Sequence, residues 1–281
     1  MPEFLLPESD WPEMPEGHRA FLARALPTFR TFDILSGVAA GGSFVLRRLD
    51  RYSDLDLIVA ITEPAAPLEK SERQKIAAAI GPLLASFTGE HVNEPRLVIC
   101  LYGPPLLHVD LKFLPIAQLH PRVEDPVILW DREGSVRRAL TTGTAAYPYP
   151  DLQWIEDRFW VWVHYGATKI GRGELLEAVD FLGSLRKLVL GPLALQRGGA
   201  RPDGVRRVEE LPTSAVANLV GTVAAYDPSS CYRALSTAIA LYREQRAALA
   251  PPSLVHRSVA EAESVSYLEA VGGALGLEGA V

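Results

Sequence analysis

The sequence has few cysteines and no long apolar run, and each shortage excludes a class of protein. Two cysteines among 281 residues, Cys100 and Cys231, cannot build a disulfide framework or a thiolate metal site, and we expect both to be inert buried thiols. No apolar run reaches the roughly 20 residues of a membrane-spanning helix, so no membrane partner is expected. The start, MPEFLLPESDWPEMPEGH, lacks the basic and apolar stretches of a secretory signal, which predicts a cytoplasmic location.

Basic residues are also in deficit. The chain has 28 Lys and Arg against 34 Asp and Glu, a net charge of -6. A protein that grips a polynucleotide through its phosphates needs basic residues in excess, so nucleic acid is not expected as a partner and polymerase or RNA-tailing activity is disfavoured. Hydrophobic residues make up 48% of the chain, enough for substantial cores, and the length favours two domains.

The first half of the sequence mixes helical and strand patterns, which predicts an α/β or α+β domain with a mixed sheet at residues 1–148. Gly103-Pro104-Pro105 separates two of the strand patterns, as the turn of a hairpin would. The spacing of apolar residues predicts a helix over 16–30, a strand over 32–38, a helical turn over 44–49, a strand over 55–61, a helix over 68–87 and strands over 96–102, 106–114 and 127–130.

The strand patterns stop near residues 141–151, TTGTAAYPYPD, and long helical patterns follow. We therefore expect an all-helical domain at residues 149–281. Its helices are predicted over 151–170, 173–196, 213–226, 228–249 and 257–276. Aromatic residues at helical spacing are expected to fill a core or domain interface, and they are Trp154, Phe159, Trp160, Trp162 and Tyr165.

A glycine turn lies between the first two predicted strands. Gly41, Gly42 and Ser43 follow the first strand, and the two glycines let backbone N–H groups approach an anion without Cβ obstruction. A following helix N-terminus would add partial positive charge. Alone, this run is typical of an ordinary turn, whereas its interval to the acidic segment 53–56 favours a turn that binds phosphate.

Three aspartates on neighbouring strands are the candidate metal ligands. Asp54 and Asp56 are two residues apart at a strand start, so both carboxylates project to one side. Asp110 interrupts a second strand pattern. Such carboxylates repel one another unless a cation lies between them, and oxygen ligands favour Mg²⁺. A solvated strand edge is the alternative for the first two, and a structural role is the alternative for Asp110. His108, on the same face as Asp110, is interpreted as a supporting or core histidine.

Gly42-Ser43, followed by Ser53-Asp54-Leu55-Asp56 and an aliphatic run, resembles the signature of the DNA polymerase β nucleotidyltransferase superfamily. The interval from Ser43 to Asp54 is similar to that of bacterial streptomycin and spectinomycin adenylyltransferases, which join such a domain to a C-terminal helical domain. The resemblance implies a polymerase β-like nucleotidyltransferase domain before the helical domain. It also implies two Mg²⁺ ions on Asp54, Asp56 and Asp110, and contacts of Ser53 and the glycine turn with the nucleotide.

The same resemblance implies a reaction. It is the transfer of a nucleoside monophosphate, most simply AMP from ATP, although another NTP is an open alternative, onto a hydroxyl of a small molecule bound between the domains. The acceptor is either an aminoglycoside or a housekeeping metabolite. Two metal ions would hold the triphosphate, lower the pKa of the attacking hydroxyl and stabilise the charge of an in-line displacement.

A second resemblance covers residues 159–176, which are similar to the helix-turn-helix that opens the helical domain of streptomycin-modifying relatives. It implies that Lys169 and Arg172 contact the phosphates of the nucleotide. It also implies that Glu174 orients or deprotonates the acceptor hydroxyl. The Arg-rich run 197–207 is interpreted as a solvated loop, with substrate contact as the alternative.

The chain departs from the superfamily pattern after the Gly-Ser pair. Family members often carry a second small residue there, whereas this chain has Leu46, Arg47 and Arg48. Either arginine binds phosphate instead, or the turn has another geometry. The second possibility suits the alternative function, a catalytically silent nucleotide-binding module of the same fold that acts as a regulator or an antitoxin-like partner. No feature of the sequence indicates an oligomeric state.

Overall fold

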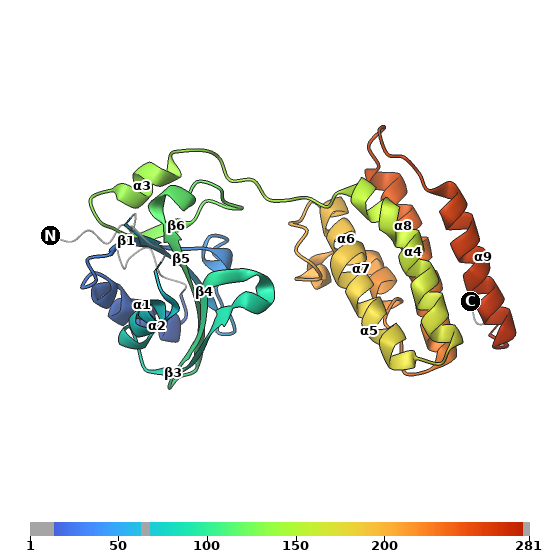
Figure 1. Ribbon diagram of the computed structural model, residues 1–281, viewed down its shortest axis with the longest axis horizontal. Helices are drawn as coiled ribbons and strands as arrows, with labels where there is room; N and C mark the ends of the chain where they lie inside the picture. The colour runs from blue at the N-terminus through green and yellow to red at the C-terminus, as the bar shows by residue number, and fades with distance from the viewer. Residues whose placement is uncertain (1–13, 63–67, 278–281) are drawn as a thin grey trace. The chain divides into compact units, whose positions relative to one another are not determined.

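The computed structural model describes residues 14–62 and 68–277, and the chain divides into two compact units between Tyr147 and Pro148 (Figure 1). The proline-rich start, for which the sequence predicts no secretory signal, lies largely outside the described residues. The first unit mixes helices and strands, whereas the described elements of the second are helical. The expected order, a mixed α/β region followed by a helical region, is therefore confirmed.

The first unit is built on a six-stranded sheet with the order β3-β4-β5-β2-β1-β6. Strands β2 and β5 are parallel, and the other neighbouring pairs are antiparallel, so the sheet is mixed as the sequence predicts. The strands are β1 (Leu35–Ala40), β2 (Leu55–Ile61), β3 (Leu83–Gly89), β4 (Glu94–Tyr102), β5 (Leu107–Pro115) and β6 (Val127–Asp131).

The two faces of the sheet are covered differently. Alternate residues of β2, including Leu55, Leu57 and Val59, are buried in a core with helices α1 (Glu16–Phe29) and α2 (Lys70–Ala79). On the opposite face, Ala60 and Leu114 form a smaller core with helix α3 (Ser135–Leu140). Figure 1 shows α3 on the side of the sheet away from α1 and α2. This smaller core lies at the ends of β2 and β5 farthest from Asp56 and Asp110.

Two sequence expectations for this unit are wrong. The helix predicted over 68–87 ends at Ala79, because Gly81 and Pro82 interrupt it and residues 83–89 pair with β4 as strand β3. The helical turn predicted over 44–49 is instead a single 3-10 turn at Gly42–Phe44, and Arg47 has a left-handed φ of 53° that no helix accommodates. The partial charge of a helix N-terminus is therefore absent from the glycine turn.

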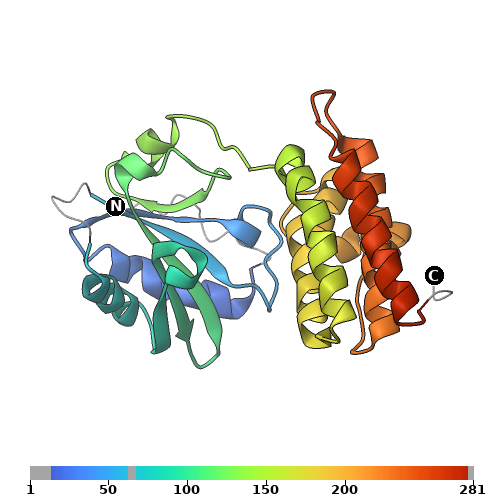
Figure 2. The same ribbon diagram turned by 45° about the vertical axis from the view of Figure 1, so that its right-hand side comes forward.

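The second unit is a set of packed helices. Helix α4 begins after Asp151, whose carboxylate accepts hydrogen bonds from the backbone N–H groups of Gln153 and Trp154. Figures 1 and 2 show α4 and α9 side by side. The helices are α4 (Leu152–Gly171), α5 (Leu175–Leu185), a π-helical turn at Arg186–Leu190, α6 (Gly191–Arg197), α7 (Thr213–Val220), α8 (Pro228–Leu249) and α9 (Ser258–Ala274).

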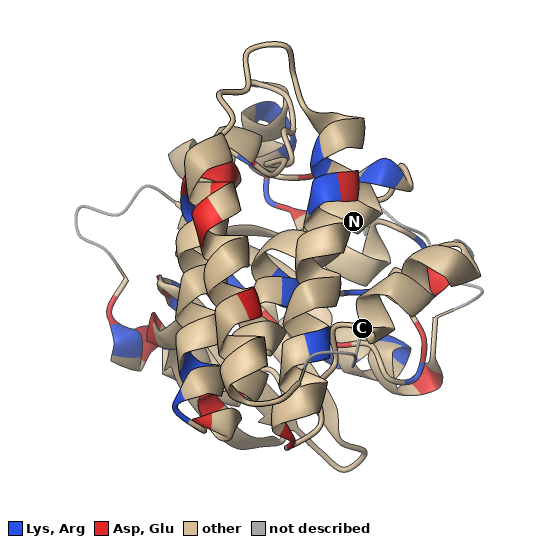
Figure 3. Ribbon diagram, turned by 90° about the vertical axis from the view of Figure 1, so that its right-hand side faces the viewer, with Lys and Arg blue, Asp and Glu red and all other residues tan. Residues whose placement is uncertain are grey.

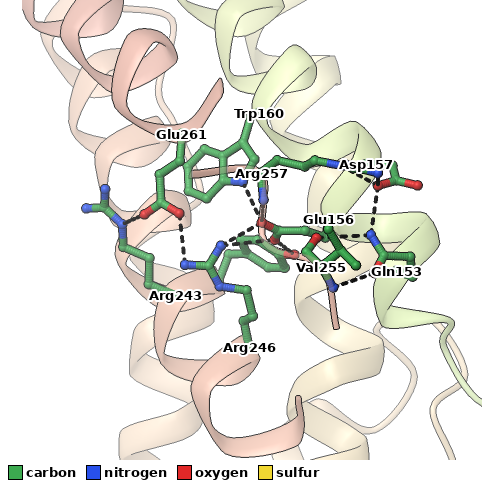
Figure 4. Close-up of polar contacts among 10 residues, drawn as sticks. Gln153, Glu156, Asp157, Trp160, Arg243, Arg246, Val255, Arg257 and Glu261 are labelled. Carbon is green, nitrogen blue, oxygen red and sulfur yellow. Dashed lines mark hydrogen bonds and ion pairs between the residues drawn. The ribbon is translucent and has the colours of Figure 1, made fainter. Parts of the chain in front are cut away.

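A buried carboxylate joins three parts of this unit. The Glu156 side chain, which is fully buried, accepts hydrogen bonds from Tyr242 Oη at 2.6 Å, Arg246 Nη1 at 2.9 Å and the backbone N–H of Arg257 at 2.9 Å (Figure 4). Trp160 Nε1 donates a fourth bond. Burial alone raises the pKa of Glu156, but the donors together outweigh burial and lower it. The charge therefore fixes α4 to α8 and to the segment before α9.

Aromatic and sulfur side chains follow the sequence predictions in part. Phe159 and Trp160 lie in the core as expected, whereas Trp154 and Tyr165 are exposed on the surface of α4. Both cysteines are buried free thiols, as predicted, and burial raises the pKa of Cys100 to about 11.

Within the described ranges, no helix is both long and apolar enough to span a bilayer. Figure 3 shows acidic and basic positions interspersed along the helices facing the viewer.

Candidate active site

Asp56 and Asp110 are direct partners in the parallel ladder between β2 and β5. Because partners in register project from the same face, the Asp56 and Asp110 side chains share one face of the sheet. Asp54 directly precedes β2. The apolar neighbours of these residues on the two strands point to the opposite face, into the core. The Asp110 side chain keeps 21% of its surface exposed, so the acids are open to solvent.

The surroundings of Asp110 raise the pKa of its carboxyl. Burial raises the pKa of this carboxyl, and the negative charge of Asp54 raises it further. His108 acts in the other direction, because its Nε2 lies 2.9 Å from Asp110 Oδ1. Asp54 is therefore near enough to Asp110 to act on the charge of its carboxyl.

The glycine turn packs directly on Asp56. The backbone N–H of Gly41 donates to the carbonyl oxygen of Asp56 at 2.9 Å. Gly42 has a φ of +59°, and a Cβ at that position would lie 2.2 Å from Asp56 Oδ2. Only glycine fits this approach. Ser43, the third residue of the turn, is partly exposed. The backbone groups expected to bind phosphate thus lie beside a predicted metal ligand.

Glu124 belongs to this site, although sequence reasoning missed it. The backbone N–H of Gly42 donates to Glu124 Oε1 at 2.6 Å, and the same oxygen would lie 3.1 Å from a Cβ at Gly41. Glu124 comes from the connection between β5 and β6, in the loop sequence Arg122-Val123-Glu124-Asp125-Pro126. Polar residues in a loop give no periodic signal, and the contact spans 82 residues of sequence, so no local pattern points to it.

Ser53 and Arg47 are also predicted to contact the nucleotide. In the structure, Ser53 bonds to Asp50 and His18, and Arg47 is exposed to solvent. The Ser53 hydroxyl accepts from the backbone N–H of Asp50 at 3.0 Å and donates to the Asp50 carboxylate at 3.1 Å. Its carbonyl oxygen lies 2.7 Å from Nε2 of His18, on α1. Ser53 thus fixes the loop before Asp54. Arg47 is exposed at the end of the glycine turn.

The remaining candidates form a cluster in the second unit, where α4 ends and α5 begins. Lys169 Nζ lies 2.6 Å from Glu174 Oε2, and an Arg172 guanidinium nitrogen lies 3.9 Å from the same carboxylate. The hydrogen bond from Lys169 lowers the pKa of Glu174, and that bond raises the pKa of Lys169. A carboxylate with a lowered pKa is a weaker base, so the pairing with Lys169 makes Glu174 a poorer proton acceptor.

Metal binding is not shown by the described residues. Across 14–62 and 68–277, no group of three or more His, Cys, Asp or Glu side chains has an arrangement that would hold a metal ion. The chemistry of the donor set still fits one class of ion. Asp54, Asp56 and Asp110 offer only carboxylate oxygens on an open face, and such ligands suit Mg²⁺ rather than a soft metal.

Comparison with solved structures gives a remote likeness. The crystal structure of an aminoglycoside 6-adenyltransferase from Bacillus subtilis matches 92% of this chain and 97% of its own, with a TM-score of 0.31 and 16% sequence identity. No protein-family model matches the chain, and no curated protein does. The function is therefore inferred from the residues of the chain itself.

These residues combine a glycine turn with acidic residues on two neighbouring strands. The turn offers backbone N–H groups, one of which already binds a carboxylate oxygen. Asp56 contacts the turn through both its backbone and its side chain, and it stands beside Asp110 across the parallel ladder. A polyphosphate on the turn would lie next to these acids. Metal-assisted phosphoryl transfer needs such a juxtaposition.

Proposed function

We propose that the chain is a Mg²⁺-dependent nucleotidyltransferase that moves a nucleoside monophosphate, AMP from ATP in the simplest case, onto a hydroxyl of a small molecule. One observation carries the proposal: the glycine turn lies against Asp56, and Asp56 is in register with Asp110. A polymerase β-like fold for the first unit is part of this proposal.

The turn would hold the phosphates of the donor. The N–H of Gly42 binds the Glu124 carboxylate at 2.6 Å, which supports a site for anionic oxygen at this position. A phosphate oxygen would take the place of that carboxylate, and the Ser43 hydroxyl would add a contact. In the second unit, Lys169 and Arg172 would bind phosphate, and Glu174 would orient the acceptor hydroxyl.

Asp54, Asp56 and Asp110 would hold the two Mg²⁺ ions. The raised pKa of Asp110 supports this role, because it reflects burial and the neighbouring charge of Asp54, both of which a bound cation would offset. Bound there, Mg²⁺ would supply charge stabilisation for the transferring phosphoryl group and a lower pKa for the attacking hydroxyl.

The chemical step is an in-line displacement. The acceptor hydroxyl oxygen forms a bond to the α-phosphorus, and the bond from that phosphorus to the bridging oxygen of the β-phosphate breaks. Pyrophosphate leaves with the electron pair, and the hydroxyl proton passes to a carboxylate of the site or to water. The residues of the chain would contribute by holding both reactants in line, which is the largest part of catalysis in phosphoryl transfer.

A silent nucleotide-binding module is the second candidate, and one observation favours it. The Gly42 N–H is already bound by Glu124, and Asp110 is already hydrogen-bonded to His108. Side chains of the protein itself therefore occupy the predicted phosphate contact and one predicted metal ligand. In such a module the nucleotide would bind the turn without transfer, and the chain would act as a regulator or an antitoxin-like partner.

Pyrophosphate release distinguishes the two candidates. The protein would be incubated with Mg²⁺, each NTP in turn and a panel of hydroxylated acceptors that includes aminoglycosides. We expect acceptor-dependent release from the wild type and none from Asp54→Ala. Asp33→Ala, which removes an exposed aspartate of the same unit, is the matched control and should keep full activity. Nucleotide binding without release for every NTP and acceptor would favour the silent module.

A further inference from the structure

The face of the sheet that carries the acids continues over β4 and β3 as an apolar surface. Asp110 pairs with Ile99 of β4, and Ile99 pairs with Phe87 of β3. In the next row, His108 pairs with Leu101. Because cross-strand partners share a face, these apolar side chains extend from the acids toward the edge of the sheet. We call Phe87, Ile99 and Leu101 the apolar row.

Part of the apolar row is exposed. Phe87 keeps 54% of its surface accessible and Leu101 keeps 38%, whereas Val98 and Cys100, which alternate with the row on β4, are buried against the other core. The small core under α3 covers Ala60 and Leu114, farther along β2 and β5. An exposed apolar strip beside polar residues is typical of a binding surface.

Two glutamates near the apolar row are paired with basic residues. Glu94, at the start of β4, lies 2.7 Å from Arg96 and 2.8 Å from Lys112. The hydrogen bond from Arg96, assisted by Lys112, holds the pKa of Glu94 at about 2. Glu90 lies 3.8 Å from Lys70. A polycationic ligand gains most from unpaired carboxylates. Glu90 and Glu94 are paired, and in the proposed site Mg²⁺ would offset Asp54, Asp56 and Asp110, so the surroundings of the row favour an uncharged ligand.

We propose that the apolar row binds the body of the acceptor, and that the acceptor is an uncharged hydroxyl compound with an aromatic or alicyclic apolar body rather than a polycation. This inference rests on the proposed nucleotidyltransferase function. Neighbouring strands lie about 4.8 Å apart, so Ile99 is one strand and Phe87 two strands from Asp110, about 10 Å in all. A compound of that length covers Phe87 with its apolar end and places a hydroxyl at the acids.

The test compares probes that differ only in an aryl group. Binding of 4-nitrophenyl β-glucoside, methyl β-glucoside and kanamycin to the full-length protein would be measured by ligand-observed NMR titration with Mg²⁺. We expect the aryl glucoside to bind about tenfold more tightly than the methyl glucoside, because its ring packs on Phe87. Phe87→Ala should remove that difference. Phe87 is half-exposed, so its truncation leaves no buried cavity, and circular dichroism would verify the fold.

Val259→Ala is the control, because Val259 is 77% exposed on α9, in the other unit. It should leave binding of all three probes unchanged. Equal binding of the two glucosides, an aryl preference that survives Phe87→Ala, or tighter binding of kanamycin would each overturn the inference. A change of sedimentation coefficient in Phe87→Ala would also overturn it, because the row would then be an interface with a second copy.

Pyrophosphate release with the same probes separates this inference from the proposed function. Release that depends on kanamycin and not on the aryl glucoside would uphold the nucleotidyltransferase and refute the acceptor class. Aryl binding that depends on Phe87, together with no release for any NTP and any probe, would refute the transferase and uphold the ligand class of the surface. Release with the aryl glucoside, reduced about tenfold by Phe87→Ala and unchanged in Val259→Ala, would support both.

Discussion

At the scale of single residues, Gly42 has the tightest surroundings of the site. Its φ of +59° is the left-handed region, and its Cα faces the Asp56 carboxylate so closely that any Cβ would overlap Oδ2. A side chain here would displace either the turn or the carboxylate. The glycine is therefore required by two independent constraints, backbone conformation and space.

We expect Gly42→Ala to abolish detectable ATP binding and to lower the free energy of unfolding of the first unit by about 2 kcal/mol, because strain and overlap add. Titration calorimetry and urea unfolding would measure the two effects. Gly199→Ala is the matched control: its φ is +71°, but nothing lies within 4 Å of its Cβ position. It should cost only the backbone strain, about 1 kcal/mol, and keep ATP binding. Normal ATP binding by Gly42→Ala would contradict the assignment of the turn.

Glu124 gives a second prediction at this scale. Its carboxylate binds the amide that the donor phosphate would need, so it competes with the nucleotide and adds negative charge beside the acids. We expect Glu124→Gln to lower the KM for ATP about three- to tenfold, since a neutral amide oxygen is a weaker hydrogen-bond acceptor than a carboxylate. Steady-state pyrophosphate release would measure it.

Asp125→Asn controls for the charge of that loop, because Asp125 is the adjacent residue and its carboxylate bonds Arg122 at 2.6 Å instead of the turn. An equal fall of KM in both variants would mean that general electrostatics, and not displacement from Gly42, is the cause. A rise of KM in Glu124→Gln would mean that the carboxylate assists nucleotide binding.

At the scale of elements, Glu156 links α4, α8 and the segment before α9. Replacing it by glutamine removes the charge that Arg246 and Tyr242 contact in a buried site. We expect Glu156→Gln to lower the free energy of unfolding of the second unit by about 3 kcal/mol at pH 7. Glu263→Gln, on the exposed side of α9, should change it by less than about 0.5 kcal/mol.

The same pair gives a pH dependence with a defined sign. The pKa of Glu156 is lower in the folded chain than its ordinary value of 4.5, so its contribution is complete above that value and is lost as pH falls through the lowered pKa. The stability difference between wild type and Glu156→Gln should therefore be constant above about pH 5.5 and shrink below pH 4.5. Thermal unfolding at pH 7, 5.5, 4 and 3 would measure it. A difference that grows in acid would contradict the charged state of Glu156.

The helices and strands also show where local sequence patterns are enough to predict secondary structure. Strand β2 is predicted at its observed ends, because an aliphatic run between polar turns allows one interpretation. Residues 83–87 follow a helical pattern and lack strand alternation, and only pairing with β4 makes them a strand. The shift of β1 to Leu35–Ala40 has the same origin, since its last residues pair with β2. Pairing with distant strands is invisible in a local window.

The candidate site, like the fold, can be predicted from the sequence only in part. Strand alternation predicts a shared side for Asp54 and Asp56 from their spacing alone, and this stays a prediction because Asp54 precedes β2. The register of Asp56 with Asp110 depends on which strands are neighbours, and the hydrogen bond of Gly42 to Glu124 depends on a loop. The spacing of residues predicts neither contact. The family resemblance predicts that Asp110 lies near Asp56, and nothing in the sequence predicts the contact of Glu124. Long-range contacts thus supply the part of the site that the sequence could not predict.

At the scale of the whole molecule, the two units have separate cores. One core combines residues between 21 and 130 and the other residues between 152 and 268. Arg122 holds the start of the connection to the first unit through the carbonyl oxygens of Leu140, Thr142 and Gly143, and residues 144–150 lack regular structure. A chain with this organisation is expected to unfold in two steps and to be cleaved first between its cores.

We expect limited digestion with proteinase K to cut the native chain between residues 144 and 151 and to leave two resistant fragments, because backbone without regular hydrogen bonds enters a protease most easily. Mass spectrometry would locate the cut. In Glu156→Gln the C-terminal fragment should disappear faster while the N-terminal fragment keeps its lifetime, since the lost interaction belongs to the second core alone. Gly42→Ala should give the reverse pattern. Equal loss of both fragments in either variant would show that the two cores unfold as one cooperative unit.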